Sequence, residues 1–167
     1  MRRAEMPRIW LSLGSNIDRR RNLGLALEAL EKAFGELVRS RVYESEAIGF
    51  EGAPFLNMVV GAQTALPVPE LMTLLRGIEA ERGRVRSGER FGPRTLDIDL
   101  LTYGDSVASG DGVELPRDEI LRYAFVLRPL AEVAGQERHP RLGLSYRELW
   151  QRFDARGQPL RPLDGGL

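Results

Sequence analysis

The predicted elements follow one another as strand, helix, strand, strand, helix, strand, and this order predicts an α+β fold of the split βαβ, ferredoxin-like type. The strands are predicted from segments in which apolar and polar residues alternate, and the helices from leucines that recur at helical spacing. Glycine and proline mark most of the turns between these segments. We therefore expect an antiparallel sheet of four or more strands, with the helices packed on one of its faces.

The first half of the chain accounts for three strands and two helices. The strands are predicted at residues 8–13, 37–45 and 55–64. The first helix is expected between Asp18, a candidate N-cap, and Gly35, a candidate C′ residue. The second helix follows two prolines and is expected to end at Gly83. The apolar stripes of the two helices are Leu23, Leu27, Leu30 and Phe34, and Leu71, Leu74, Leu75 and Ile78.

The second half contains the fourth strand, at residues 95–102, and a helical region at residues 117–134 in which Pro129 can introduce a break. A loose hairpin or loop is expected between them. Further along, Ser145 and Glu148 form the capping-box pattern that begins a short last helix.

Length and composition indicate one domain, residues 1–167, of an ordinary globular protein with 43% hydrophobic and 29% charged residues. The Gly- and Pro-rich residues 154–167 are expected to form a loosely ordered tail.

Charge and cysteine usage narrow the range of partners. The 24 basic and 24 acidic residues give a net charge of zero, which argues against nucleic-acid or anionic-membrane binding. The absence of cysteine excludes disulfides and thiolate metal sites. Neither a signal-peptide pattern nor an apolar run of roughly 20 residues is found, so a cytoplasmic protein is expected. We also expect the protein to be a monomer.

Two aspartates lie on one face of the fourth predicted strand. Leu96, Ile98 and Leu100 alternate with Asp97 and Asp99, so both carboxylates point the same way, about 6–7 Å apart at Cα. Carboxylates this close repel each other unless a cation neutralises them, and Mg²⁺ is commonly held by one or two carboxylates together with substrate phosphates. The pattern indicates a metal–phosphate site, and its alternative is a solvated polar strand face.

An arginine-rich segment precedes this strand and strengthens the first interpretation. Its four arginines are Arg84, Arg86, Arg90 and Arg94. Gly88, Gly92 and Pro93 interrupt it, which is typical of a loop. Because guanidinium groups bind phosphate oxygens in bidentate fashion, the loop and the aspartate pair together favour a site for a metal and a polyphosphate.

Residues 84–99, which read RVRSGERFGPRTLDID, resemble the signature of the 6-hydroxymethyl-7,8-dihydropterin pyrophosphokinases, a folate-pathway family. Residues 13–16, LGSN, resemble the family's opening motif, and the resemblance extends over about residues 9–129. It implies transfer of pyrophosphate from ATP to the pterin hydroxyl with AMP leaving. It also implies that Asp97 and Asp99 hold two Mg²⁺ ions.

The resemblance further implies three groups of site residues. The catalytic group is Arg84, Arg94, Asp97 and Asp99. The nucleotide is expected to contact Arg76, Glu79, Arg84, Arg86, Arg94, Leu100, Arg117 and Arg122. The pterin pocket is expected to contain Ser45, Ile48, Phe55, Asn57, Phe91 and Phe125. Two of these phenylalanines, Phe55 and Phe125, would stack on the flat ring while the Asn57 amide binds its edge.

Three positions depart from the family pattern. Ser87 stands where a lysine is common, and Arg117 stands where a histidine often follows the proline. Tyr123 stands where many members have an arginine. Arg117 can take the role of the imidazole, and Arg122 either replaces the missing arginine or the contact is lost. These departures concern nucleotide affinity more than reaction class.

Two other functions fit parts of the pattern. The first is a non-catalytic small-ligand or RNA-binding module on the same fold plan; RNA binding would need aromatic side chains and a basic sheet face, whereas the strand expected to be central carries two aspartates. The second is a simple Mg-dependent kinase or nucleotidyltransferase, which would release a different product. The sequence has no Gly-x-x-x-x-Gly-Lys loop, which argues against a P-loop kinase. The only histidine, His139, lies in a proline-containing loop and is expected to have no catalytic role.

Overall fold

The computed structural model describes residues 6–46, 53–81, 96–110 and 112–167. Its elements are β1 (Arg8–Ser15), α1 (Arg19–Phe34), β2 (Val38–Arg39), β3 (Tyr43–Ser45), β4 (Phe55–Gln63), α2 (Val68–Glu81), β5 (Asp97–Tyr103), β6 (Ala108–Gly110), β7 (Val113–Leu115), the 3-10 helix η2 (Asp118–Leu121), α3 (Ala124–Ala134), α4 (Tyr146–Arg152) and β8 (Leu160–Pro162). Among these described residues, no helix is both long and apolar enough to cross a lipid bilayer.

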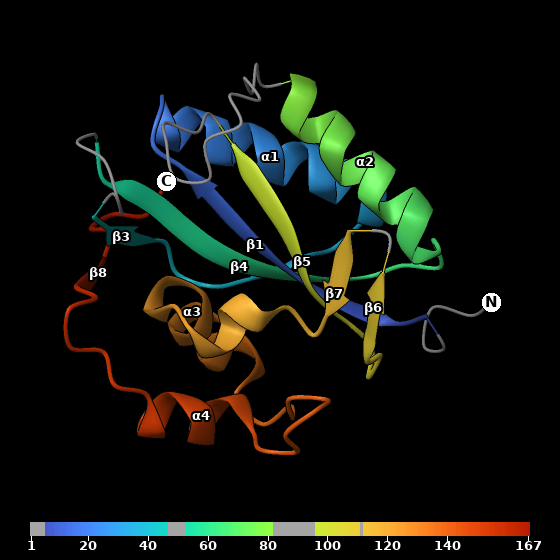
Figure 1. The fold of residues 1–167 in the computed structure, drawn as a ribbon. Helices are drawn as coiled ribbons and strands as arrows, with labels where there is room; N and C mark the ends of the chain where they lie inside the picture. Colours follow the sequence, from blue (N-terminus) through green and yellow to red (C-terminus); the bar gives the residue numbers. More distant parts are fainter. Residues whose placement is uncertain (1–5, 47–52, 82–95, 111) are drawn as a thin grey trace.

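The main sheet has the order β5-β1-β4-β3-β8, with β2 also paired to β4, and its pairings are antiparallel (Figure 1). Strand β1 therefore lies between β4 and β5. This order is the one expected of a ferredoxin-like sheet, so the predicted α+β class is confirmed. Strands β6 and β7 form a separate hairpin where a loose one was predicted.

Helices α1 and α2 cover one face of the sheet (Figure 1). The predicted stripes supply their contacts: the leucines at positions 23, 27 and 30 of α1 and at 71 and 75 of α2 are fully or nearly fully buried. They pack against every second side chain of the strands, including Leu11 and Leu13 of β1 and Leu56 and Met58 of β4. The two periodicities read from the sequence thus meet in one core.

Helices α3 and α4 cover the opposite face, so the prediction that helices pack on one face is wrong (Figure 1). This second core contains Trp10, Val59 and Leu101 from the sheet. The remaining side chains of β4 are thus buried as well, as a strand between two layers requires. Tyr43 of β3 donates a hydrogen bond to Glu132 of α3, and burial together with Glu132 raises the pKa of Tyr43 to about 12.

Several element boundaries differ from the predictions. The predicted strand at 37–45 is interrupted and becomes β2 and β3. The helical region breaks between η2 and α3, before Ala124, and Pro129 lies inside α3. Asp18 precedes α1 in a left-handed conformation, φ 42°, and its side chain makes no capping hydrogen bond within the described chain. Ser145 does cap α4, since its hydroxyl accepts from the Glu148 backbone N–H.

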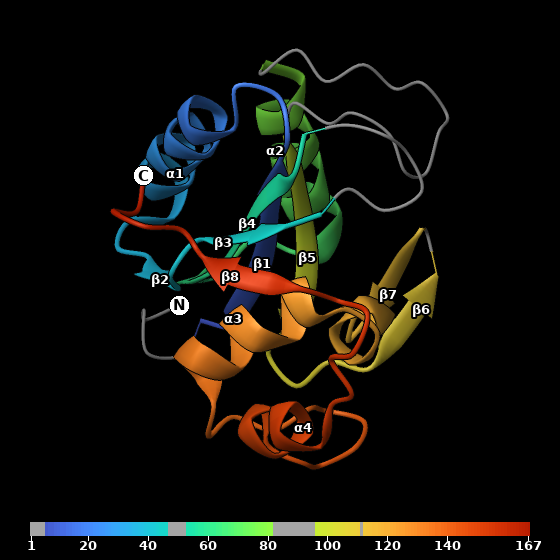
Figure 2. The ribbon, with the colours of Figure 1, turned by 90° about the vertical axis from the view of Figure 1, so that its left-hand side faces the viewer.

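Within residues 154–167, where Gly and Pro content suggested a loosely ordered tail, residues 160–162 form strand β8. Strand β8 pairs with β3 and closes that edge of the sheet (Figure 2). Arg161 of β8 and Arg19 of α1 both bind the carboxylate of Glu44, and their hydrogen bonds lower its pKa. Proline is tolerated there because an outermost strand needs no further ladder hydrogen bond on its free side. The partner strand β3 is distant in sequence, so local Gly and Pro content could not predict this pairing.

Two glycines that differ in the space around them allow the packing to be tested. A Cβ on Gly61 of β4 would overlap the six-membered ring of Trp10, whereas one on Gly77 of α2 would meet no atom within 4 Å. We expect Gly61→Ala to lower the free energy of unfolding by about 1–3 kcal/mol, because the ring cannot move within a packed core. Gly77→Ala is expected to raise it by up to about 1 kcal/mol.

Denaturant unfolding of both variants measures the difference. A Gly61→Ala protein as stable as the parent chain would show that Trp10 does not lie over β4 as described.

Candidate active site

One row of side chains crosses three strands at the end of β1. Gly14 of β1 lies opposite Asn57 of β4 on one side and Asp97 of β5 on the other. Directly opposed residues of antiparallel strands point to the same face, and neighbouring strands lie about 4.8 Å apart. Asp97 and Asn57 therefore lie on one face, about 10 Å apart at Cα, with only a glycine between them.

A second row places Asp99 on the same face. Ser12 of β1 lies opposite Asp99 of β5 and Val59 of β4. Because Val59 belongs to the core beneath α3, both aspartates project from the face that α3 and α4 cover. The predicted strand pattern is confirmed here: Leu96, Ile98 and Leu100 are buried among the helices of the other face, whereas both aspartates are half-buried.

Arg117 provides the positive charge that two neighbouring carboxylates need. Its Nη2 lies 3.8 Å from the Asp99 carboxylate and 2.7 Å from that of Glu119. Burial alone lowers the pKa of an arginine, but the charges of Asp99, Glu119 and Asp97 outweigh it and raise the pKa of Arg117 above its ordinary value. An arginine thus lies beside the aspartates at the position where the family often has histidine.

An ion pair from α2 holds the backbone between the two aspartates. Glu79, which is 1% exposed, accepts a hydrogen bond from the Ile98 N–H at 2.8 Å, and Arg76 donates to the Ile98 carbonyl at 2.7 Å. Arg76 also donates to Glu79. Strand β5 lies at the edge of the sheet, and this pair takes the place of a neighbouring strand at Ile98. The direction of both carboxylates is therefore fixed from α2.

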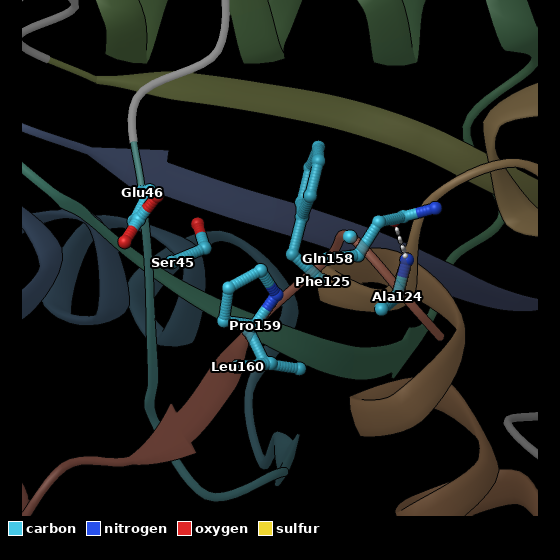
Figure 3. A pocket seen from close by; sticks show the side chains of 8 residues that line it. Ser45, Glu46, Ala124, Phe125, Gln158, Pro159 and Leu160 are labelled. Atoms are coloured by element: carbon cyan, nitrogen blue, oxygen red, sulfur yellow. Dashed lines mark hydrogen bonds between the residues drawn. The ribbon is translucent and has the colours of Figure 1, made fainter. Parts of the chain in front are cut away.

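The predicted pterin-binding residues gather at the other end of the row. Asn57, which is 3% exposed, donates to the Ser45 hydroxyl at 2.7 Å, and Phe55 lies opposite Ser45 across the β3–β4 pairing. Phe125 is half-buried, and its ring stacks on Tyr123 with centroids 5.1 Å apart. A pocket lies between Ser45 and Phe125, with residues 157–160 on its remaining side (Figure 3).

Two further predicted nucleotide contacts remain predictions. Arg122 is exposed and pairs with Asp118 of η2 at 3.1 Å. Leu100 has its side chain in the core beneath α1 and α2, so only its backbone is placed to meet a ligand. The remaining predicted site residues lie outside the described parts of the chain: Ile48, Arg84, Arg86, Phe91 and Arg94.

The part that β1 plays in the site was not predicted from the sequence. The first strand was predicted at residues 8–13, but Gly14 also belongs to it, and a Cβ there would lie 3.1 Å from the Asn57 side-chain oxygen. The signal was present in the pattern, because Ser12 and Gly14 are small residues alternating with Leu11 and Leu13. Small residues at alternate positions of a strand often mark a place where other groups approach closely.

The donor set suits a hard cation shared with a ligand. No cluster of three or more His, Cys, Asp or Glu side chains that could hold a metal occurs within the described ranges. Two carboxylates are nevertheless enough for Mg²⁺, which keeps part of its water shell and takes further oxygen ligands from phosphates. Asp97 and Asp99 are the residues that would hold it.

The fold resembles part of solved structures of HPPK-DHPS proteins. The structure of Plasmodium falciparum HPPK-DHPS with pteroate aligns with a TM-score of 0.69 at 15% identity, covering 89% of this chain and 42% of that one. At this level of identity the likeness concerns the fold alone.

Sequence comparison identifies the family. The model of 7,8-dihydro-6-hydroxymethylpterin-pyrophosphokinase (HPPK) matches residues 10–135. The 2-amino-4-hydroxy-6-hydroxymethyldihydropteridine pyrophosphokinase of Aquifex aeolicus is 38% identical over 138 residues, which is 81% of this chain and 85% of that protein. The chain belongs to the HPPK family.

Other relatives are longer proteins. The folic acid synthesis protein fol1 of Pneumocystis carinii is 34% identical over 150 residues, which cover 87% of this chain. The chain spans about a fifth of that relative's length and 42% of the Plasmodium protein.

The hydrogen bonds that Glu79 and Arg76 of α2 make to Ile98, here called the clamp, can be tested separately from any ligand. We expect Glu79→Ala to lower the free energy of unfolding by about 2–4 kcal/mol, because it leaves the Ile98 N–H and the Arg76 guanidinium without their buried partner. Glu79→Gln keeps an acceptor for Ile98 and should lose less. Glu28→Ala, an exposed position on α1, is the control and should change stability by no more than about 0.5 kcal/mol.

Chemical denaturation followed by circular dichroism measures all three variants. Equal stability of the Glu79→Ala and Glu28→Ala proteins would contradict the clamp.

Proposed function

We propose that this chain transfers the pyrophosphoryl group of ATP to the hydroxymethyl group of 6-hydroxymethyl-7,8-dihydropterin, giving AMP and the pterin diphosphate in folate biosynthesis. The observation that carries the proposal is the row in which Asp97, Gly14 and Asn57 share one face of the sheet. This row connects a candidate binding site for phosphates with a candidate binding site for a flat, polar heterocycle. The family and the name of the Aquifex aeolicus relative support the same reaction.

In the proposed reaction the pterin hydroxyl oxygen attacks the β-phosphorus of ATP, the bond from that phosphorus to the bridging oxygen of AMP breaks, and the hydroxyl proton is released to solvent. Asp97 and Asp99 are the residues that would hold two Mg²⁺ ions, which would supply charge neutralisation on the attacking and leaving sides. Because no covalent enzyme intermediate is required, positioning and electrostatics account for most of the rate enhancement.

The arginines of the chain bind the rest of the triphosphate. Arg117 lies beside Asp99, and its buried Nε–H has no hydrogen-bond partner among the described residues. The same holds for the Nε–H of Arg76, so both side chains retain a donor near the aspartate strand. Arg84, Arg86 and Arg94 are assigned to the triphosphate by the family signature alone, and we propose that their loop excludes water from the reacting groups.

Pterin recognition combines stacking with directional hydrogen bonds. Phe55 and Phe125 bind the two faces of the ring, a geometry that favours a planar heterocycle over aliphatic alcohols. Asn57 binds the ring edge with its amide, whose orientation is held by the Ser45 hydroxyl. Phe91 and the backbone at Ile48 complete the pocket in this proposal.

The proposal includes a monomeric enzyme of one domain that acts in the cytoplasm. The absence of cysteine is compatible with a reducing compartment. The zero net charge supports small molecules rather than nucleic acid as partners.

Product analysis tests the reaction class. Incubation with ATP, Mg²⁺ and the reduced hydroxymethylpterin should yield AMP and the pterin diphosphate in equal amounts, as measured by chromatography. ADP and a pterin monophosphate would instead indicate simple phosphoryl transfer. Unchanged ATP and pterin would contradict both reactions.

The aspartate pair can be tested by removing one charge. Asp97→Asn should lower kcat by about a hundredfold or more at saturating Mg²⁺, because an amide is a poor ligand for a hard cation. Its circular dichroism spectrum should match that of the parent chain. Asp164→Asn is the control, since Asp164 is exposed and far along the chain in the C-terminal segment. Undiminished turnover in the Asp97→Asn protein would rule out its assignment as a metal ligand.

A further inference from the structure

The pocket beside Phe125 is completed by the C-terminal segment of the chain. Ser45 and Glu46 line it on the side of β3, and Ala124 and Phe125 line it at the start of α3. Residues 157–160 form the remaining wall (Figure 3). The pairing of β8 with β3 holds this wall in place, with Leu160 opposite Ser45.

Gln158 makes the direct connection between this segment and α3. Its side-chain oxygen accepts a hydrogen bond from the Ala124 N–H at 2.8 Å, and its side-chain nitrogen donates to the Arg122 carbonyl at 3.1 Å. Figure 3 shows Gln158 beside Phe125, with the bond to Ala124. One amide thus binds the backbone on both sides of Tyr123.

This amide replaces a cap that α3 otherwise lacks. The first N–H groups of a helix have no partner within the helix, and a Ser, Thr, Asp or Asn at the N-cap usually supplies one. The N-cap of α3 is Tyr123, and its side chain makes no capping bond in the part of the chain that the structure describes. Gln158, 34 residues away, instead accepts from the N–H of Ala124, the first residue of the helix.

Fixing the first turn of α3 also fixes Phe125. Phe125 is the second residue of the helix, next to Ala124, and its ring stacks on Tyr123, which lies between the two groups that Gln158 binds. A shift of this turn would move both rings. Stacking on a flat ligand depends on ring position, so a small displacement would weaken it.

We infer that Gln158 is a positioning residue for the pterin: it holds the first turn of α3 so that the Phe125 ring forms one wall of the substrate pocket. This inference rests on the proposed function, because it takes the pocket as the pterin site. The match to the family model ends at residue 135, so nothing in the family comparison assigns a role to this segment.

Two substitutions at Gln158 separate positioning from general stability. Gln158→Leu has a similar size and makes neither hydrogen bond. It should raise the Kd for 6-hydroxymethyl-7,8-dihydropterin about fivefold, the size expected for loss of a helix cap. Gln158→Glu keeps the acceptor for the Ala124 N–H, and its charge suits the helix N-terminus, but it loses the donor to the Arg122 carbonyl, so its Kd should lie between those of the parent and the leucine variant. The KM for ATP should change less than the pterin Kd in the leucine variant.

Binding is measured by calorimetry with Mg²⁺ and α,β-methylene-ATP, in which the bond to be broken is blocked. Gln151→Leu, an exposed position on α4, is the matched control. Gln158→Asn, which is one methylene too short to bind both groups, replaces the leucine variant if that protein does not fold.

Three results would overturn the inference. The first is an unchanged pterin Kd in Gln158→Leu while the parent chain binds the pterin. The second is an equal loss of pterin and ATP binding, and the third is a glutamate variant as weak as the leucine variant. If the parent chain itself binds no pterin, the proposed function fails and this inference fails with it.

Discussion

The antiparallel pairing of β1 with both β4 and β5 is the constraint on which the site depends. It places Gly14 between Asn57 and Asp97, and Ser12 beside Asp99, so residues from three distant segments share one face. A register shift by one residue would turn the aspartates into the core beneath α1 and α2, which no pairing of charges there could compensate. The same hydrogen bonds that stabilise the sheet therefore fix the spacing between the two ends of the site.

The two faces of the sheet differ in their polarity. The face under α1 and α2 is a continuous apolar core. The side chains of Leu96, Ile98 and Leu100 pack into this core and so support β5. The other face is apolar only under α3 and α4, and its polar part lies where β1 ends. Rigid support on one side and polar groups on the other is the usual way in which a scaffold orients a binding site.

Much of this could be read from the sequence because it depends on local patterns. The strand alternation at Leu96, Ile98 and Leu100 predicted the direction of both aspartates, and the leucine spacing of the two helices predicted their buried stripes. What could not be predicted depends on partners far along the chain. Gln158 reaches Ala124, and β8 pairs with β3, although Gly and Pro in that segment indicated a loose tail. The helices of the second layer were predicted, but not the face on which they pack, because a strand buried on both faces loses its alternation.

The central claim is that one row of the sheet holds the metal–phosphate end and the pterin end of a single site. A crystal structure with Mg²⁺, α,β-methylene-ATP and the dihydropterin tests it most directly. We expect Mg²⁺ coordinated by carboxylate oxygens of Asp97 and Asp99 at about 2.0–2.1 Å, with the pterin against Phe125 and its edge at Asn57. Ions held by other side chains, or a pterin bound away from this row, would contradict the account.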